Sequence, residues 1–175
     1  MEQRMFEGGA LMKNVILPIV KVTTPIVGGR LIGKFAVKNA RKDYSKNVKP
    51  PFSPPGYIFP IVWPILYMSM GIAYALVSHK PGKKRIKGAY YTQLGLNYGW
   101  SILYFKYKLR FSALIESAVL LGAVLMTTIT FFNVKKLAGL ILVPYTLWSA
   151  FATYLTAGNW LLNKDNPRYT DKSNV

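Results

Sequence analysis

The sequence predicts an all-α fold, an integral membrane bundle of five transmembrane helices that forms a single domain over residues 1–175. Four stretches of about 20 residues carry no charge or only one, which is the length that crosses a bilayer core about 30 Å thick. Lys and Arg residues gather in short runs between these stretches, as in loops that face anionic lipid. In addition, 51% of the residues are hydrophobic and only 17% are charged.

The first expected span, residues 15–37, is the weakest of the five because it contains Lys21, Arg30 and Lys34. Each charge would cost up to about 3 kcal/mol at the middle of a bilayer, and less where a long side chain reaches the interface. Arg30 and Lys34 lie near one end of the segment and can reach it. Lys21 is harder to accommodate, and it leaves an interfacial helix as the alternative.

The segment 38–56 is expected to be a loop, because it is basic and ends in the proline-rich sequence of residues 50–55. Proline lacks the N–H that a helix needs and restricts the residue before it. The other expected spans are residues 57–77, 89–105, 111–132 and 137–162. Short connections between them predict a compact bundle of antiparallel neighbours.

The composition narrows the possible functions. The net charge of +17 allows nucleic-acid binding as a minor alternative, but the basic residues lie in loops between apolar stretches, so we expect a lipid partner and no nucleic acid. The chain has no cysteine and no phosphate loop, nucleophile elbow or zinc signature. We therefore expect no metal and no cofactor, and a binding protein is favoured over an enzyme.

Three of the expected helices carry stripes in which aromatic side chains alternate with a few hydrogen-bonding groups at helical spacing. Such stripes suit a flat ligand that stacks and must be oriented, although ordinary packing or an interfacial belt explains them as well. The stripes are Phe59, Trp63, Tyr67 and Tyr74; Gln93, Asn97, Trp100 and Tyr104; and Tyr145, Trp148, Ala152 and Thr156.

Small residues and one acid also stand out in the expected spans. Gly29 to Gly33 and Gly95 to Gly99 have the spacing that lets helices approach closely, which is compatible with a homodimer and equally with packing inside one chain.

Glu116 is the one acid within a span. A carboxylate paired with a loop Lys or Arg is the favoured interpretation of Glu116, with proton transfer as the alternative.

Several sequence motifs, in order along the chain, resemble the translocator protein family, also named TspO/MBR or tryptophan-rich sensory proteins, which includes the peripheral benzodiazepine receptor. They run from the first loop to about Asn163. The motifs are PPFSPPGYIF at residues 50–59, VWPILY at 62–67, LNYGWS at 96–101, ALIE at 113–116 and VPYTLWSAFATYL at 143–155.

The resemblance implies five transmembrane helices, often in a dimer, with a ligand cavity closed by the loop between the first two helices. It implies as ligands porphyrins, sterols in animal members, and synthetic benzodiazepine-site compounds. Phe52 stands where the family commonly has Trp, and Thr156 where it often has Asn. By motif position the ligand-binding residues would be Tyr44, Pro54, Trp63, Tyr67, Asn97, Trp100, Trp148, Ala152 and Thr156.

Three functions follow as hypotheses from this resemblance. The first is a receptor or transporter that binds porphyrins and takes part in tetrapyrrole or stress signalling. The second is light- and oxygen-dependent porphyrin degradation, in which Trp63 and Trp148 would take part. The third is a structural or regulatory partner protein. A bacterial plasma membrane is the expected location, or the mitochondrial outer membrane if the source is eukaryotic.

Overall fold

The structure is a computed structural model that describes residues 12–37 and 44–166, and helices are its dominant element throughout these ranges. Residues 38–43 of the predicted loop lie outside the described part. The predicted all-α class is confirmed. The helices in chain order are η1 (Met12–Ile16), α2 (Leu17–Ala36), α4 (Phe59–Val77), α5 (Lys83–Ser101), η2 (Ile102–Lys106), α6 (Arg110–Val134) and α7 (Lys136–Asn163).

Helix boundaries follow from the residues at the turns. A proline in the first turn of α4 loses no helical hydrogen bond there, so α4 can begin directly after the proline-rich loop. Gly82 precedes α5 with φ +81°, a conformation that glycine adopts without steric cost. Helix α5 begins six residues before the predicted span at 89, because its first turns extend the helix through a polar, basic segment.

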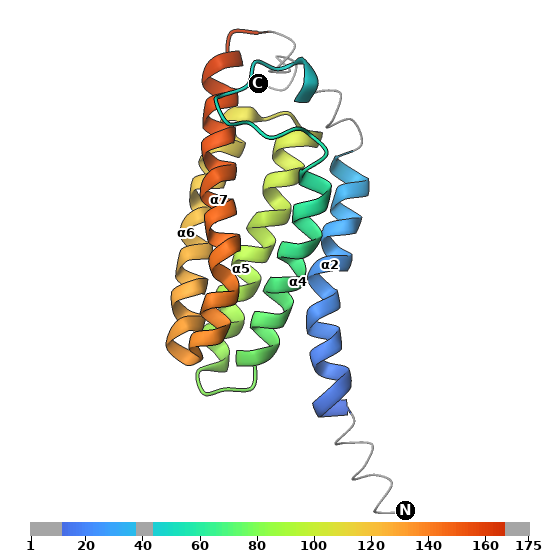
Figure 1. The fold of residues 1–175 in the computed structure, drawn as a ribbon, viewed down its shortest axis with the longest axis vertical. Coiled ribbons are helices and arrows are strands. Elements are labelled where there is room, and N and C mark those ends of the chain that lie inside the picture. Colours follow the sequence, from blue (N-terminus) through green and yellow to red (C-terminus); the bar gives the residue numbers. More distant parts are fainter. Residues whose placement is uncertain (1–11, 38–43, 167–175) are drawn as a thin grey trace, which may run out of the picture.

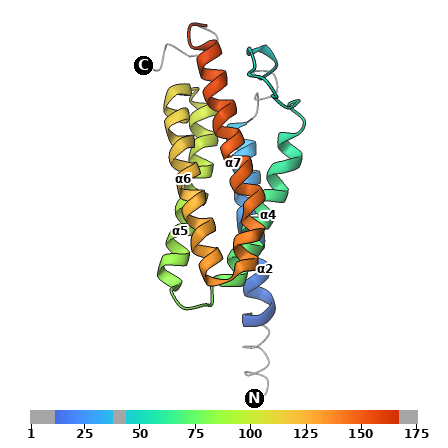
Figure 2. The ribbon, with the colours of Figure 1, turned by 60° about the vertical axis from the view of Figure 1, so that its left-hand side comes forward.

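The five described α-helices form a ring, in which all neighbours are antiparallel except α5 and α2. Helix α2 packs on α4, α4 on α7, α7 on α6, α6 on α5, and α5 again on α2. Figure 1 shows the helices side by side, with the loop that precedes α4 lying across one end. In the turned view of Figure 2, α7 lies between α6 and α4. We call the end that carries this loop the lid end, and the described loop residues 44–56 the lid loop.

Three of the described helices are long and apolar enough to cross a membrane, namely α4, α6 and α7. Helix α2 contains Lys21, Arg30 and Lys34, and α5 starts with a run of basic residues, so these two helices do not meet the same criterion. The structure thus identifies three of the five predicted spans by length and composition.

Lys21 lies where its charge can be accommodated. Its Nζ donates a hydrogen bond of 2.7 Å to the hydroxyl of Ser78, the residue that ends α4, and it lies 6.0 Å from the centre of the Tyr74 ring. Because Ser78 marks the end of α4 away from the lid, the side chain of Lys21 extends towards that end of the bundle, although its backbone lies beside Gly71. A long side chain in this position can bring its charge to an interface.

The end of the bundle away from the lid is tightly packed. The rings of Tyr74 and Tyr90 are stacked with their centres 4.0 Å apart, and Phe131 lies beside both. Met70, on the next turn of α4, has no exposed surface. We call this region the packed half.

Candidate functional site

The lid-end half of the bundle encloses a cavity of about 930 Å³. All five α-helices, η2 and the lid loop contribute to its lining, which is predominantly apolar. A cavity of this size and character is within the range of sites for drug-sized ligands. It lies where the sequence stripes converge, above the packed half.

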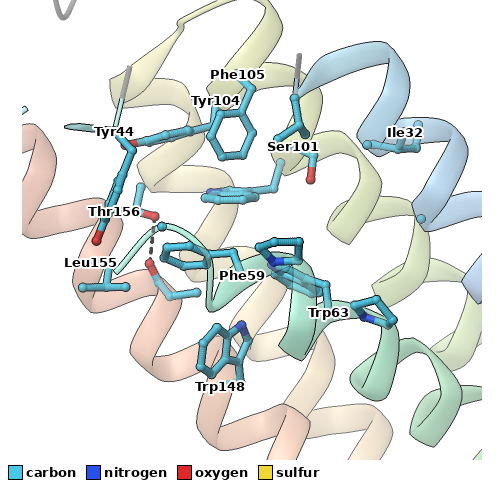
Figure 3. A pocket seen from close by; sticks show the side chains of 18 of the residues that line it. Ile32, Tyr44, Phe59, Trp63, Ser101, Tyr104, Phe105, Trp148, Leu155 and Thr156 are labelled. Carbon is cyan, nitrogen blue, oxygen red and sulfur yellow. Dashed lines mark hydrogen bonds between the residues drawn. The ribbon is translucent and has the colours of Figure 1, made fainter. Parts of the chain in front are cut away.

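Aromatic side chains from three directions form the walls of the cavity. Trp63 and Tyr67 come from α4, with ring centres 5.6 Å apart, whereas Trp100 stacks on Tyr104 at 5.1 Å. Helix α7 contributes Trp148. Figure 3 shows Tyr104 on one side of the pocket and Trp63 and Trp148 on the other. Flat aromatic faces therefore border the space on more than one side.

Phe59, the first residue of α4, connects the lid loop to the cavity wall. Its ring meets Tyr44 of the loop edge-on at 5.5 Å and Trp148 of α7 at 6.1 Å. The Tyr44 hydroxyl donates to the carbonyl of Pro54 at 2.9 Å. Burial raises the pKa of Tyr44, opposed by a hydrogen bond with Ser53, so its hydroxyl stays protonated and remains a donor.

The floor of the cavity is a chain of buried hydrogen bonds. Tyr67 lines the cavity and donates to Asn97 at 2.7 Å. Asn97 in turn donates to the Tyr145 hydroxyl at 3.2 Å, and Tyr145 donates to Gln93 at 2.8 Å. These four residues satisfy one another where α4, α5 and α7 meet, which separates the cavity from the packed half. We call them the polar floor.

Seven of the nine predicted ligand-binding residues lie in the cavity lining. Asn97 is 1% exposed and lies in the floor, where it holds Tyr67. Pro54 is not part of the lining, and its carbonyl holds Tyr44. The seven lining residues are Tyr44, Trp63, Tyr67, Trp100, Trp148, Ala152 and Thr156.

Several other lining residues were not among the predicted ligand-binding residues. Phe59 and Tyr104 were on the aromatic stripes, and Asn159 follows Thr156 at a helical spacing of three, so periodicity could have found all three. No pattern pointed to Arg110, which is 4% exposed. Its guanidinium lies over the Tyr104 ring at 4.0 Å and donates to the Tyr104 carbonyl at 2.6 Å.

Some buried polar atoms at the cavity have no hydrogen-bond partner among the described residues. They include the indole nitrogens of Trp100 and Trp148 and the amide oxygen of Asn159. The Asn159 amide nitrogen donates to the carbonyl of Leu155 at 2.7 Å, which fixes the orientation of the amide. A ligand in this cavity could therefore be held by aromatic faces and a small number of hydrogen bonds.

Glu116 differs from the favoured interpretation of its sequence position. Both of its carboxyl oxygens are buried and lack a hydrogen-bond partner within the described ranges, rather than pairing with a loop Lys or Arg. A Cβ atom added to Gly99 of α5 would lie 3.9 Å from one of these oxygens. The expected pairing is therefore not present among the residues that the structure describes, and the absence of a side chain at Gly99 leaves room for the carboxyl group.

The glycines at positions 29 and 33 and at 95 and 99 contribute at least partly to packing within one chain. A side chain at Gly29 would meet the Tyr67 ring, and Gly99 lies opposite Glu116, whereas Gly33 and Gly95 have open space beside them. Intramolecular packing thus accounts for one glycine of each pair.

The sequence model of the TspO/MBR family matches residues 21–161, which include every α-helix described above apart from the ends of α2 and α7. The chain belongs to the TspO/MBR family. It is accordingly a membrane protein, and the resemblance seen in the motifs is confirmed.

Relatives from distant organisms share most of its length. The tryptophan-rich protein TspO of Chlorobaculum tepidum is 36% identical over 137 residues, covering 76% of this chain and 85% of that protein. The human translocator protein is 31% identical over 147 residues, covering 81% of this chain and 85% of the relative. The tryptophan-rich sensory protein of Cereibacter sphaeroides is 32% identical over 124 residues, covering 71% and 78%.

Proposed function

We propose that this TspO/MBR protein is a receptor or transporter-like membrane protein that binds a porphyrin, or a similarly flat apolar ligand, in the cavity between its helices. The observation that carries the proposal is the cavity of about 930 Å³ with aromatic faces on opposite sides. Offset stacking on Trp and Tyr rings suits a large planar ligand. The names translocator and sensory protein among the relatives support transport or sensing.

Five membrane spans are part of this proposal. Helices α2 and α5 have 20 and 19 residues, so at 1.5 Å per residue each is about as long as a bilayer core is thick. Both lie in the same ring as the three apolar helices. The prolines within α2, α4 and α7 are compatible with membrane helices, where neighbouring helices can satisfy the freed backbone groups.

Each predicted site residue has a role in this proposal. Trp63, Trp100 and Trp148 supply stacking faces, and Tyr67 is positioned by Asn97 beneath it. Ala152 leaves space beside Trp148, since the two lie four residues apart on one face of α7. Thr156 lies one turn further along the same face. Tyr44, held by Pro54, covers the lid end.

The protein is further proposed to act as a homodimer in a bacterial plasma membrane, with lipid around the apolar faces of its helices. Many of the exposed large hydrophobic residues lie on the outer faces of α6 and α7, as expected where lipid or a second copy covers them. Oligomeric state measured in lipid nanodiscs tests this part of the proposal separately from ligand binding.

Titration of the purified protein with protoporphyrin IX in nanodiscs tests the proposed binding. Three of the four tryptophans line the cavity, so a bound porphyrin should quench most of the tryptophan fluorescence at micromolar concentration. Absence of quenching would contradict the proposal and would favour a structural or regulatory role without a porphyrin ligand.

Light- and oxygen-dependent degradation of the porphyrin is the second candidate function. It is favoured by the position of Trp63 and Trp148, which line the same side of the cavity and would both lie close to a bound ring. Illumination of the complex in air distinguishes the candidates. Loss of porphyrin absorbance that requires both tryptophans would support degradation, whereas constant absorbance with demonstrated binding would support binding alone.

A further inference from the structure

We propose that Arg30 and Lys34 of α2 form an anion subsite at the edge of the cavity, which binds an acidic group carried by an otherwise apolar ligand. This inference rests on the proposed function and adds to it both a ligand chemistry and an orientation. The two residues are one helical turn apart, and both line the cavity while their side chains remain exposed.

The two cations are available to a ligand. Neither Arg30 nor Lys34 forms an ion pair with any described residue, and the only acids in the described ranges, Glu116 and Asp165, do not line the cavity. Gly33 lies between them in the sequence, and a Cβ atom added there would meet no atom within 4 Å. Space for a ligand group therefore exists beside both charges.

The rest of the lining also favours a ligand with hydrogen-bond acceptors. Arg110 adds a third positive charge, which its contacts with Tyr104 hold in place. The indole N–H groups of Trp100 and Trp148 are donors without a partner among the described residues. Among the buried lining atoms without a described partner, these two donors accompany one acceptor, the amide oxygen of Asn159. A carboxylate satisfies donors of this kind through charge-assisted hydrogen bonds.

The distribution of charge predicts how the ligand lies. Arg30 and Lys34 are exposed on α2, whereas Trp63 and Trp148 lie on α4 and α7 and border the apolar part of the cavity. An amphiphilic ligand would place its apolar body against these tryptophans and its acidic group at α2. Long basic side chains suit this edge, since their stems lie along apolar surface while their charges stay hydrated.

Two matched probes test the subsite at pH 7.5. Protoporphyrin IX carries two carboxylates, and its dimethyl ester has the same ring system without charge. We expect the unmodified protein in phosphatidylcholine nanodiscs to bind the acid up to roughly fivefold more tightly than the ester, because a partly exposed ion pair is worth up to about 1 kcal/mol.

The double variant Arg30→Gln, Lys34→Gln should lose this preference and keep its affinity for the ester. The control is Lys84→Gln, Arg85→Gln, which removes the same charge from exposed positions at the other end of the bundle. The control should keep the preference. Thermal unfolding of both variants checks that these exposed substitutions leave the fold intact.

The outcomes separate this inference from the proposed function. Equal binding of acid and ester would overturn the anion subsite and leave porphyrin binding standing, as would a preference that persists in the Arg30, Lys34 variant. Failure of both probes to bind would contradict the proposed function itself.

A lipid phosphate has the same charge as a ligand carboxylate, so its competition is measured directly. The titration is repeated in nanodiscs that contain phosphatidylglycerol. Unchanged affinity for the acid would support the ligand assignment. A loss of affinity that disappears in the Arg30, Lys34 variant would make the lipid headgroup the occupant of these cations and would overturn that assignment.

Discussion

The two halves of the bundle use the same kinds of side chain for opposite purposes. In the packed half, the rings of Tyr74 and Tyr90 stack on each other at 4.0 Å and leave no space between them. In the lid-end half, Trp63 and Trp148 border a cavity of about 930 Å³. Aromatic residues at helical spacing therefore do not by themselves indicate a pocket, because the spacing of the helices decides whether the rings meet.

Glycine sets that spacing where α2 crosses α4. A Cβ atom added to Gly71 would lie 2.6 Å from the Cα atom of Val22, so the two backbones are in direct contact there. Towards the lid, Gly29 of α2 accommodates the ring of Tyr67 instead. In the packed half, α2 and α4 are in backbone contact. In the lid-end half, side chains hold these helices apart, which leaves space for the cavity on the lid side of the polar floor.

The largest effect is expected from Gly71→Leu, which would force α2 away from α4. The obstacle is backbone, which cannot move aside as a flexible side chain can, so we expect a loss of about 3 kcal/mol of stability or failure to fold. Unfolding in detergent measures the change. Gly122→Leu is the control, since nothing lies within 4 Å of a Cβ atom added there and the position is exposed. Equal stability of the two variants would show that the crossing does not hold the packed half together.

Next in size is Ala152→Phe in the lid-end half. The new ring would occupy the cavity beside Trp148, so porphyrin affinity should fall roughly tenfold or more while the fold is retained. Tryptophan quenching measures the affinity. Ala150→Phe, on an exposed face of the same helix, should bind normally. Unchanged affinity in Ala152→Phe would place the ligand elsewhere.

The sequence predicted the helices and seven of the residues that line the cavity because both depend on local patterns. Uncharged stretches marked the apolar helices, and motif order placed Trp63, Trp148 and Ala152 together. It did not predict that Tyr74, on the same stripe as Trp63, would be packed against Tyr90. That difference depends on contacts between different helices, such as those of Phe131 of α6 with the rings of Tyr74 and Tyr90.

Local sequence patterns also do not give the hydrogen-bond partners of the polar residues. Asn97 was expected in the ligand site, but its two described hydrogen bonds, to Tyr67 and Tyr145, place it in the floor. The partner of an amide depends on which groups face it from other helices. Helical spacing gives the face on which a residue lies but not the residue opposite.

Tyr145→Phe tests whether the polar floor separates the two halves. The variant removes the hydroxyl that Asn97 donates to and that donates to Gln93, so we expect a loss of about 1 kcal/mol of stability. Porphyrin affinity should change little, because Tyr145 is not part of the cavity lining. Thermal unfolding and quenching measure the two effects. A large loss of affinity without a loss of stability would make the floor part of the ligand site.

The smallest effect is expected at the hydrogen bonds that join the lid loop to α7. The side chain of Asn163 donates to the Val48 carbonyl at 2.8 Å and accepts from the Val48 N–H at 2.9 Å. Asn163→Leu removes both bonds, but Val48 is exposed, so water can replace them and the closed lid should lose about 1 kcal/mol or less. Porphyrin release, followed by stopped-flow fluorescence, should become roughly threefold faster.

A second variant tests whether the rate of porphyrin release depends on the number of hydrogen bonds that the lid loop loses. Tyr154 donates one hydrogen bond, of 2.9 Å, to the Pro51 carbonyl, and Tyr154→Phe removes it while keeping the ring. Because one bond is lost instead of two, release should accelerate less than in Asn163→Leu. If both variants release porphyrin at the unmodified rate, the lid loop does not limit exit, and the open path must lie between helices. The helices around the cavity would then have to be packed more loosely than those of the packed half, since only loosely packed helices let a ligand pass between them into the bilayer.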